Sequence, residues 1–157
     1  MFFQTIYKWF KALFGQELFD YFRGYDSIKE EIIGSNQFIS IGIITVVITF
    51  LFMLLYYYVI NHPRFNQWWS WLIVLVFVGL VNLFVGYGLT PSLSGGNIPA
   101  SLMTQLEDGN SIPLIGQIEC WGFGLANSIV SIMWFIVFSL CFKWWSRNCK
   151  YSPFIKF

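Results

Sequence analysis

Charge is what this sequence has least of. Only 11% of its 157 residues are Asp, Glu, Lys or Arg, against about 25% in an ordinary soluble domain. Because 57% are hydrophobic and 22% aromatic, a chain of this length could not cover its folded surface with polar side chains. A conventional soluble globule is therefore excluded, and lipid is the expected surrounding. The formal net charge of +1 also lacks the basic field that nucleic-acid binding requires, so no nucleic-acid partner is expected.

Metal ligands and catalytic motifs are equally scarce. There is one histidine, His62, and the three cysteines form no Cys-x-x-Cys pair, so we expect no metal site and no cofactor. No Gly-x-Ser-x-Gly element or phosphate-binding glycine-rich loop occurs. Proton pumps, carboxylate-based transporters and membrane metalloproteases need ionisable side chains at membrane depth, and the apolar runs contain none. We therefore expect the protein not to be an enzyme.

What the chain does have is three long stretches without charge, at 32–63, 65–106 and 120–142. A helix rises about 1.5 Å per residue, so roughly 20 apolar residues cross the ~30 Å hydrocarbon core of a bilayer. The sequence predicts an all-α integral membrane protein, with three transmembrane helices preceded by an N-terminal amphipathic interfacial helix. The predicted parts are an N-terminal segment (1–37), a membrane domain (38–146) with spans at 38–60, 68–90 and 121–142 and an extramembrane loop at 91–120, and a basic tail (147–157).

The residues that flank the spans predict an orientation. Tyr and Trp gather where the first span ends, the second begins and the third ends, which is typical of an aromatic belt at one membrane interface. That side also carries basic residues and no acidic ones. Cytoplasmic loops and tails typically show this excess, so we expect the C-terminus on the cytoplasmic or matrix side of a plasma, inner or organellar inner membrane.

The N-terminal segment has a helical pattern. Its apolar residues recur at spacings of three and four, which predicts an amphipathic helix over 2–22. This helix either lies in the bilayer interface or packs against the bundle or partner subunits. A second short helix is expected over 27–33, with Gly34-Ser35-Asn36 as the break before the first span. The apolar positions of the first helix are Phe3, Ile6, Tyr7, Phe10, Leu13, Phe14, Leu18 and Tyr21.

The loop 91–120 is interrupted by prolines and glycines and is expected to be irregular and to lie outside the hydrocarbon, although its uncharged part, 91–106, leaves a re-entrant segment open. Its acidic residues Glu107, Asp108 and Glu119 form either an acidic vestibule in a symmetric oligomer, which would attract cations, or a merely solvated loop.

In each span, small or polar residues occur at a first position and again three and seven residues later. This spacing returns to one helix face, so each span carries one stripe of them. A stripe of this kind either packs helices closely, within the chain or against other chains, or lines a hydrated path. The stripe residues are Gly42, Thr45 and Thr49, then Gly79, Asn82 and Gly86, then Gly124, Asn127 and Ser131, with Ser128 beside them.

Two functions follow from these patterns. The first is a non-enzymatic membrane protein that assembles through its transmembrane helices into an oligomeric complex, with a pore or channel-like effector as its specific form. The second is an accessory or structural subunit of a larger secretion, respiratory or transport complex. In both cases the expected partners are the lipid bilayer and either further copies of the chain or other membrane subunits.

Overall fold

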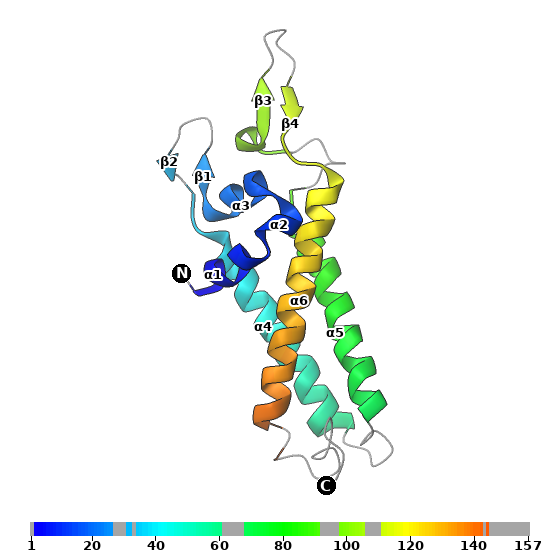
Figure 1. Ribbon diagram of the computed structural model, residues 1–157. Coiled ribbons are helices and arrows are strands. Elements are labelled where there is room, and N and C mark those ends of the chain that lie inside the picture. Colours follow the sequence, from blue (N-terminus) through cyan, green and yellow to red (C-terminus); the bar gives the residue numbers. More distant parts are fainter. Residues whose placement is uncertain are drawn as a thin grey trace. The chain divides into compact units, whose positions relative to one another are not determined.

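The computed structural model describes residues 2–26, 31–32, 34–60, 68–91, 98–105, 111–142 and 144 (Figure 1). Most of them are helical. Three helices are long and apolar enough to cross a membrane: α4 (Gln37–Leu54), which continues into the π-helical turn η1 (Leu55–Ile60), α5 (Trp68–Gly88) and α6 (Gln117–Phe142). They confirm the three predicted apolar helices, although α6 begins earlier than the expected residue 121. The basic tail, 147–157, lies outside the described residues.

The chain divides into two compact units. One comprises Met1–Ile43 and Leu83–Asn127, and the other comprises Ile44–Asn82 and Ser128–Phe157. Every charged residue in the described part of the chain belongs to the first unit. The second unit therefore consists, where it is described, of uncharged helix.

Side chains define where two of the long helices begin. The Asn36 carboxamide oxygen accepts a hydrogen bond from the Phe38 N–H at 3.1 Å, which is an N-cap interaction and places the predicted break at the start of α4. At α6, the Glu119 carboxylate accepts a hydrogen bond from the Gly116 N–H at 2.8 Å. This bond is the side-chain half of a capping box, because it satisfies the N–H of the residue before the helix.

The N-terminal segment forms three short helices rather than the expected single one. They are α1 (Phe2–Trp9), α2 (Lys11–Phe14) and α3 (Gln16–Arg23). The chain turns at Phe10 and at Gly15, where a φ of +82° suits glycine. Periodicity detects the apolar face, but it does not show that this face is divided among helices of different direction.

Residues after α3 form a hairpin where a helix was expected. Strand β1 (Tyr25–Asp26) pairs antiparallel with β2 (Glu31–Ile32), so the helix predicted over 27–33 is wrong at its described residues. At the open end of the hairpin, the Gly34 N–H donates a hydrogen bond to the Gly24 carbonyl oxygen at 3.0 Å. A Cβ on Gly24 would lie 2.4 Å from the Gly34 carbonyl oxygen, so the two backbones approach this closely only because Gly24 has no side chain.

The loop between α5 and α6 is also more regular than expected. It contains the 3₁₀ turn η3 (Ala100–Leu102) and an antiparallel hairpin of β3 (Met103–Gln105) and β4 (Ser111–Pro113). Leu102 is buried, and η3 contacts α3. The predicted irregular loop is therefore wrong at these residues, while re-entry into the membrane stays a prediction.

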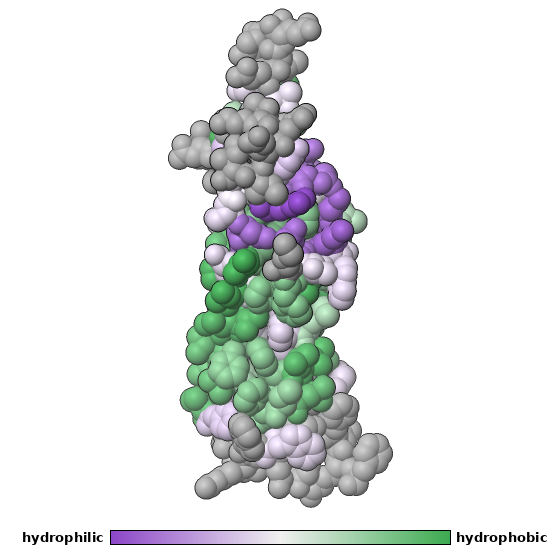
Figure 2. Space-filling view, turned by 90° about the vertical axis from the view of Figure 1, so that its left-hand side faces the viewer, coloured by the Kyte–Doolittle hydropathy of each residue, from purple (hydrophilic) through white to green (hydrophobic). Residues whose placement is uncertain are grey.

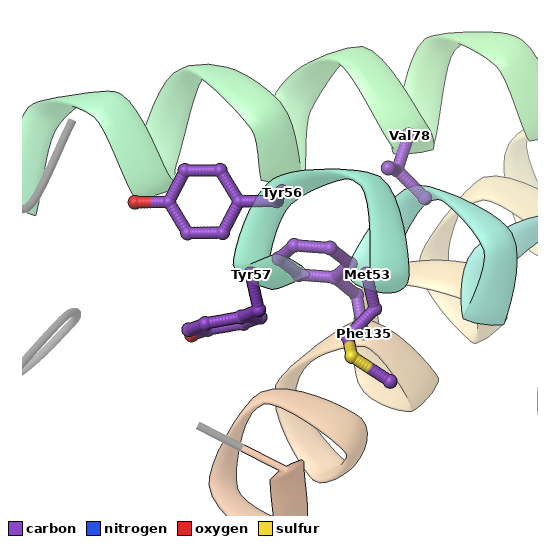
Figure 3. Packing of buried hydrophobic residues seen from close by; sticks show 5 residues of the cluster. All are labelled: Met53, Tyr56, Tyr57, Val78 and Phe135. Atoms are coloured by element: carbon purple, nitrogen blue, oxygen red, sulfur yellow. The ribbon is translucent and has the colours of Figure 1, made fainter. Parts of the chain in front are cut away.

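The second unit has an apolar core contributed by all three long helices (Figure 3). Two polar contacts accompany it. The Trp71 indole N–H donates to the Ser139 hydroxyl at 3.2 Å, and the Tyr58 hydroxyl donates to the Phe142 carbonyl at 3.1 Å. These bonds tie α6 to α5 and to η1. The core residues are Met53, Tyr56, Tyr57, Val78 and Phe135.

Candidate functional site

The ten stripe residues lie on the inner faces of the long helices. All are buried except Ser128, which is half-buried. The polar members Thr45, Thr49, Asn82, Asn127 and Ser131 are each 0% exposed. The spacing of these residues therefore marks the faces that the chain buries within itself.

Several polar side chains of the stripes bond to backbone on their own helix. The Thr49 hydroxyl donates to the Thr45 carbonyl at 2.7 Å, and the Ser131 hydroxyl donates to the Ser128 carbonyl at 2.7 Å. The Asn82 amide donates to the Val78 carbonyl at 3.0 Å. Each of these bonds satisfies a donor of the buried side chain, which lowers the cost of burying that side chain away from water.

The stripe glycines are points of close approach between helices. A Cβ on Gly86 of α5 would lie 3.0 Å from the Gly124 Cα and 2.8 Å from the Asn127 Cβ of α6. In return, a Cβ on Gly124 would lie 2.7 Å from the Leu83 carbonyl oxygen. Any side chain here would force the helices apart, which is the role that small residues have at membrane helix contacts.

The same stripes make contacts elsewhere on the long helices. In the second unit, a Cβ on Gly79 would lie 3.1 Å from the Ser128 hydroxyl oxygen. In the first unit, the ring of Phe3 covers Gly42, where a Cβ would lie 2.3 Å from the ring. Gly42 thus packs against the N-terminal helix α1 and not against another long helix.

A cluster of aromatic rings, the aromatic cap, fills the first unit. The Tyr7 ring stacks against Phe38 of α4 and Phe123 of α6, with centroids 5.4 and 5.7 Å apart. Phe22 of α3 lies 4.5 Å from Phe123. Six rings make up the cap, and none is more than 5% exposed: Tyr7, Phe14, Phe19, Phe22, Phe38 and Phe123.

One hydrogen bond joins the aromatic cap to a stripe. The Tyr7 hydroxyl donates to the Asn127 carboxamide oxygen at 2.5 Å, and both side chains are 0% exposed. Nearby, a Cβ on Gly122 would lie 1.9 Å from the Leu13 carbonyl oxygen, so the backbone of α2 rests directly on α6. Two members of the apolar face predicted for the N-terminal helix, Tyr7 and Phe14, are therefore covered by the chain's own helices, whereas Leu13 of that face is exposed.

Of the three acidic residues of the loop, the structure describes Glu119. Glu119 caps α6 through the Gly116 N–H, whereas Glu107 and Asp108 lie outside the described residues. Within the described ranges, no group of three His, Cys, Asp or Glu side chains could hold a metal ion. Cys120 is buried and Cys141 is exposed.

Sequence reasoning found the stripes but not their partners. Tyr7 and Asn127 are 120 positions apart, and no local pattern links a helical tyrosine to an asparagine at that separation. The Trp71–Ser139 bond was missed as well, because its residues are also far apart in the sequence and Ser139 is outside the spacing of three and seven residues that marks the stripes.

Comparison with known proteins returned no match: no family model, no curated protein and no solved structure is recognisably similar to this chain.

Proposed function

We propose that the chain is an integral membrane protein whose helices α4, α5 and α6 cross the bilayer. The observation that carries this proposal is their inverted polarity. Asn82 and Asn127 are 0% exposed, while Phe84 of α5 is 61% exposed. Water would favour the reverse arrangement, whereas lipid favours apolar side chains outside and polar groups bonded inside. Figure 2 shows hydrophobic residues covering a broad part of one face, and hydrophilic residues gathered in one region of it.

Exposed aromatic side chains support one membrane boundary. Tyr58, Trp68, Trp69 and Trp144 are exposed where η1 and α6 end and where α5 begins. Tyr and Trp favour the headgroup level, because their rings are apolar and their N–H or O–H groups reach water. This belt is the expected interface on the C-terminal side.

The opposite boundary follows from helix length. Counting about 20 residues along α6 from Phe142 leads to Gly122, and the same count from Tyr58 of η1 back along α4 leads to Phe38. Next to Gly122, the Trp121 ring stacks on Tyr87 of α5 with centroids 4.4 Å apart. A second pair of interfacial aromatic residues therefore lies where the count places the second boundary.

A pair of lysine substitutions on α5 tests the membrane proposal. Phe77 and Trp69 are both exposed, at 51% and 65%, but only Phe77 would lie near the bilayer centre. Phe77→Lys should cost about 2.5–3.5 kcal/mol of insertion free energy, while Trp69→Lys at the interface should cost far less. Membrane insertion is measured by resistance to alkaline carbonate extraction. If both lysine variants behave alike and the protein is found in the soluble fraction after carbonate extraction, the membrane proposal is refuted.

We further propose that the protein acts as a non-enzymatic, structural subunit of a membrane complex. The support is that the polar side chains a pore would present to water, such as Thr49, Asn82 and Ser131, are buried and bonded within the chain. The side chains that face outward from the same helices are bulky and apolar, as in a helix that faces lipid or another apolar helix. The oligomeric assembly with a pore as its specific form, which is the first of the two functions predicted from the sequence, is kept as the second candidate.

Conductance separates these two roles. Vesicles reconstituted with the purified chain alone should hold an ion gradient, and Asn82→Leu should not change the leak. The particle mass in detergent shows whether the chain associates with itself or only with other subunits. A closed ring of identical chains whose leak falls in Asn82→Leu or Asn127→Leu would overturn the structural role and support the pore.

The proposed orientation places the C-terminus on the cytoplasmic or matrix side. It rests on basic residues without acidic ones at that end of the spans. In a background where Cys120 and Cys141 are replaced, a cysteine introduced at Ser94 should react with an impermeant reagent from outside, whereas Cys149 should not. The opposite labelling pattern would reverse the orientation and leave the spans unchanged.

A further inference from the structure

The N-terminal helices carry an outer face of exposed apolar side chains that are not part of the aromatic cap. Phe2 and Trp9 are 62% and 69% exposed, and Leu13 is also exposed. Phe2 and Trp9 lie on the same side of α1, because residues about seven apart are nearly in line on a helix of 3.6 residues per turn. We infer that this outer face, Phe2, Trp9 and Leu13, lies in the headgroup–acyl boundary of the bilayer. The inference rests on the proposed membrane spans.

The contacts of α1 and α2 set their level along the long helices. The Phe3 ring lies on Gly42, and the Leu13 carbonyl lies on Gly122. The Tyr7 hydroxyl reaches Asn127, which is five positions beyond Gly122, or about 7.5 Å at 1.5 Å per residue. The N-terminal helices therefore lie beside the first turns of the long helices, from the expected boundary at Gly122 to a short distance into the hydrocarbon.

That level matches the depth of a known kind of helix. Amphipathic helices in the interface are buried about 5–10 Å into the headgroup–acyl boundary. A side chain that points outward from α1 at this level meets lipid unless another protein covers it. The outer face of α1 is thus expected at the depth where interfacial helices reside, although Tyr7 and Phe14 of the apolar face predicted from the sequence are covered by the chain itself.

The surroundings of the outer face favour lipid as its occupant. On α4, Ile39 and Ile43 lie on one side of Gly42 and are exposed, at 45% and 51%, so α1 packs beside side chains of the proposed lipid-facing surface. Lys8, next to Trp9, is exposed. A lysine at this depth can extend its ammonium group to the phosphates while its alkyl chain stays in apolar surroundings, and tryptophan favours the same level.

Spin labels on single cysteines test the inference in reconstituted vesicles of zwitterionic and anionic phospholipid. With the native cysteines replaced, labels are attached at Trp9→Cys, at Val137→Cys as the lipid control on α6, and at Ser111→Cys as the water control on β4. Val137 and Ser111 are both exposed. Collisions with oxygen report lipid, and collisions with a water-soluble nickel chelate report water. We expect the label at position 9 to favour oxygen and to lie about 5–10 Å below the phosphates.

The controls separate failure of this inference from failure of the membrane spans. If the label at 137 lies in lipid while the label at 9 collides mainly with the nickel chelate, the spans stand and the lipid contact of α1 is overturned. Protection of the label at 9 from both reagents means that protein covers the face, which also overturns the inference. If the label at 137 collides with the nickel chelate, the proposed spans themselves fail.

Discussion

The Tyr7–Asn127 hydrogen bond allows the attachment of the aromatic cap to be tested with the loss of one oxygen atom. Tyr7→Phe removes the hydroxyl that donates to Asn127 at 2.5 Å and retains the ring that stacks on Phe38 and Phe123. Any change in stability therefore reports the bond and not the packing. Tyr7→Ala removes both and provides the upper limit.

The expected magnitudes differ between the two variants. A typical buried hydrogen bond contributes about 1 kcal/mol net, and bonds between membrane helices average about 0.6 kcal/mol with a maximum near 1.7. We expect Tyr7→Phe to weaken attachment of the cap by about 1 kcal/mol, roughly fivefold in the opening equilibrium. Loss of a buried aromatic ring costs about 3–5 kcal/mol, so Tyr7→Ala should leave the cap largely detached.

Cys120 supplies a reporter within the same unit. Its side chain is 2% exposed, and the neighbouring Gly122 is covered by Leu13. With Cys141 and Cys149 replaced by serine, the rate of Cys120 modification by a thiol reagent measures how often this region opens. The rate should rise about fivefold in Tyr7→Phe and much further in Tyr7→Ala. Tyr21→Phe, at a half-buried tyrosine of α3, is the matched control and should not change it.

A double-mutant cycle decides whether the bond itself is responsible. Tyr7→Phe and Asn127→Ala should each raise the Cys120 rate, and together they should raise it by less than the product of the single effects. Strict multiplication of the two effects would refute the energetic coupling. Wild-type labelling in Tyr7→Phe beside fast labelling in Tyr7→Ala would mean that ring packing alone holds the cap.

Two further substitutions test the backbone contacts of α6. Gly122→Ala would place a Cβ 1.9 Å from the Leu13 carbonyl oxygen, so it should accelerate Cys120 labelling by the equivalent of about 1–3 kcal/mol or more. Gly88→Ala is the control and should not change the rate, because a Cβ there would have nothing within 4 Å. Equal labelling rates in the two variants would contradict the close approach of α2 to α6. Glu119→Ala removes the acceptor for the Gly116 N–H and should destabilise the first turn of α6 by about 1 kcal/mol, which is measured as faster amide hydrogen exchange in that turn. Glu119→Gln retains an acceptor oxygen and should preserve most of the protection from exchange. Unchanged exchange in both variants would exclude a capping role for Glu119.

Helix boundaries were predictable where local chemistry sets them. A break at Gly34-Ser35-Asn36 was expected before a span at residue 38, and the structure begins α4 at Gln37, directly after Asn36 as its N-cap. The start of α6 was expected too late, because the acidic Glu119 was assigned to the loop although it caps the helix from within. A charge ends an apolar window without ending a helix.

The hairpins show the limit of such local rules. The sequence around residues 25–32 is short, mixed in polarity and without a two-residue turn signal, so neither strand stands out. Their pairing depends on the backbone approach of Gly24 to Gly34, a contact between positions that no periodicity relates. The strands β3 and β4 were missed for the same reason, since only their pairing with each other makes them regular.

By itself, the sequence determined that three long helices form, where their apolar windows lie, and which face of each carries small and polar residues, because charge, length and helical spacing are local properties. Tertiary structure decided what each face meets. Gly86 packs against Gly124, Gly42 packs against the ring of Phe3, and Asn127 accepts a hydrogen bond from the Tyr7 hydroxyl. Helical spacing places residues on a common face, but the partner of that face depends on contacts between distant segments, which only the folded chain brings together.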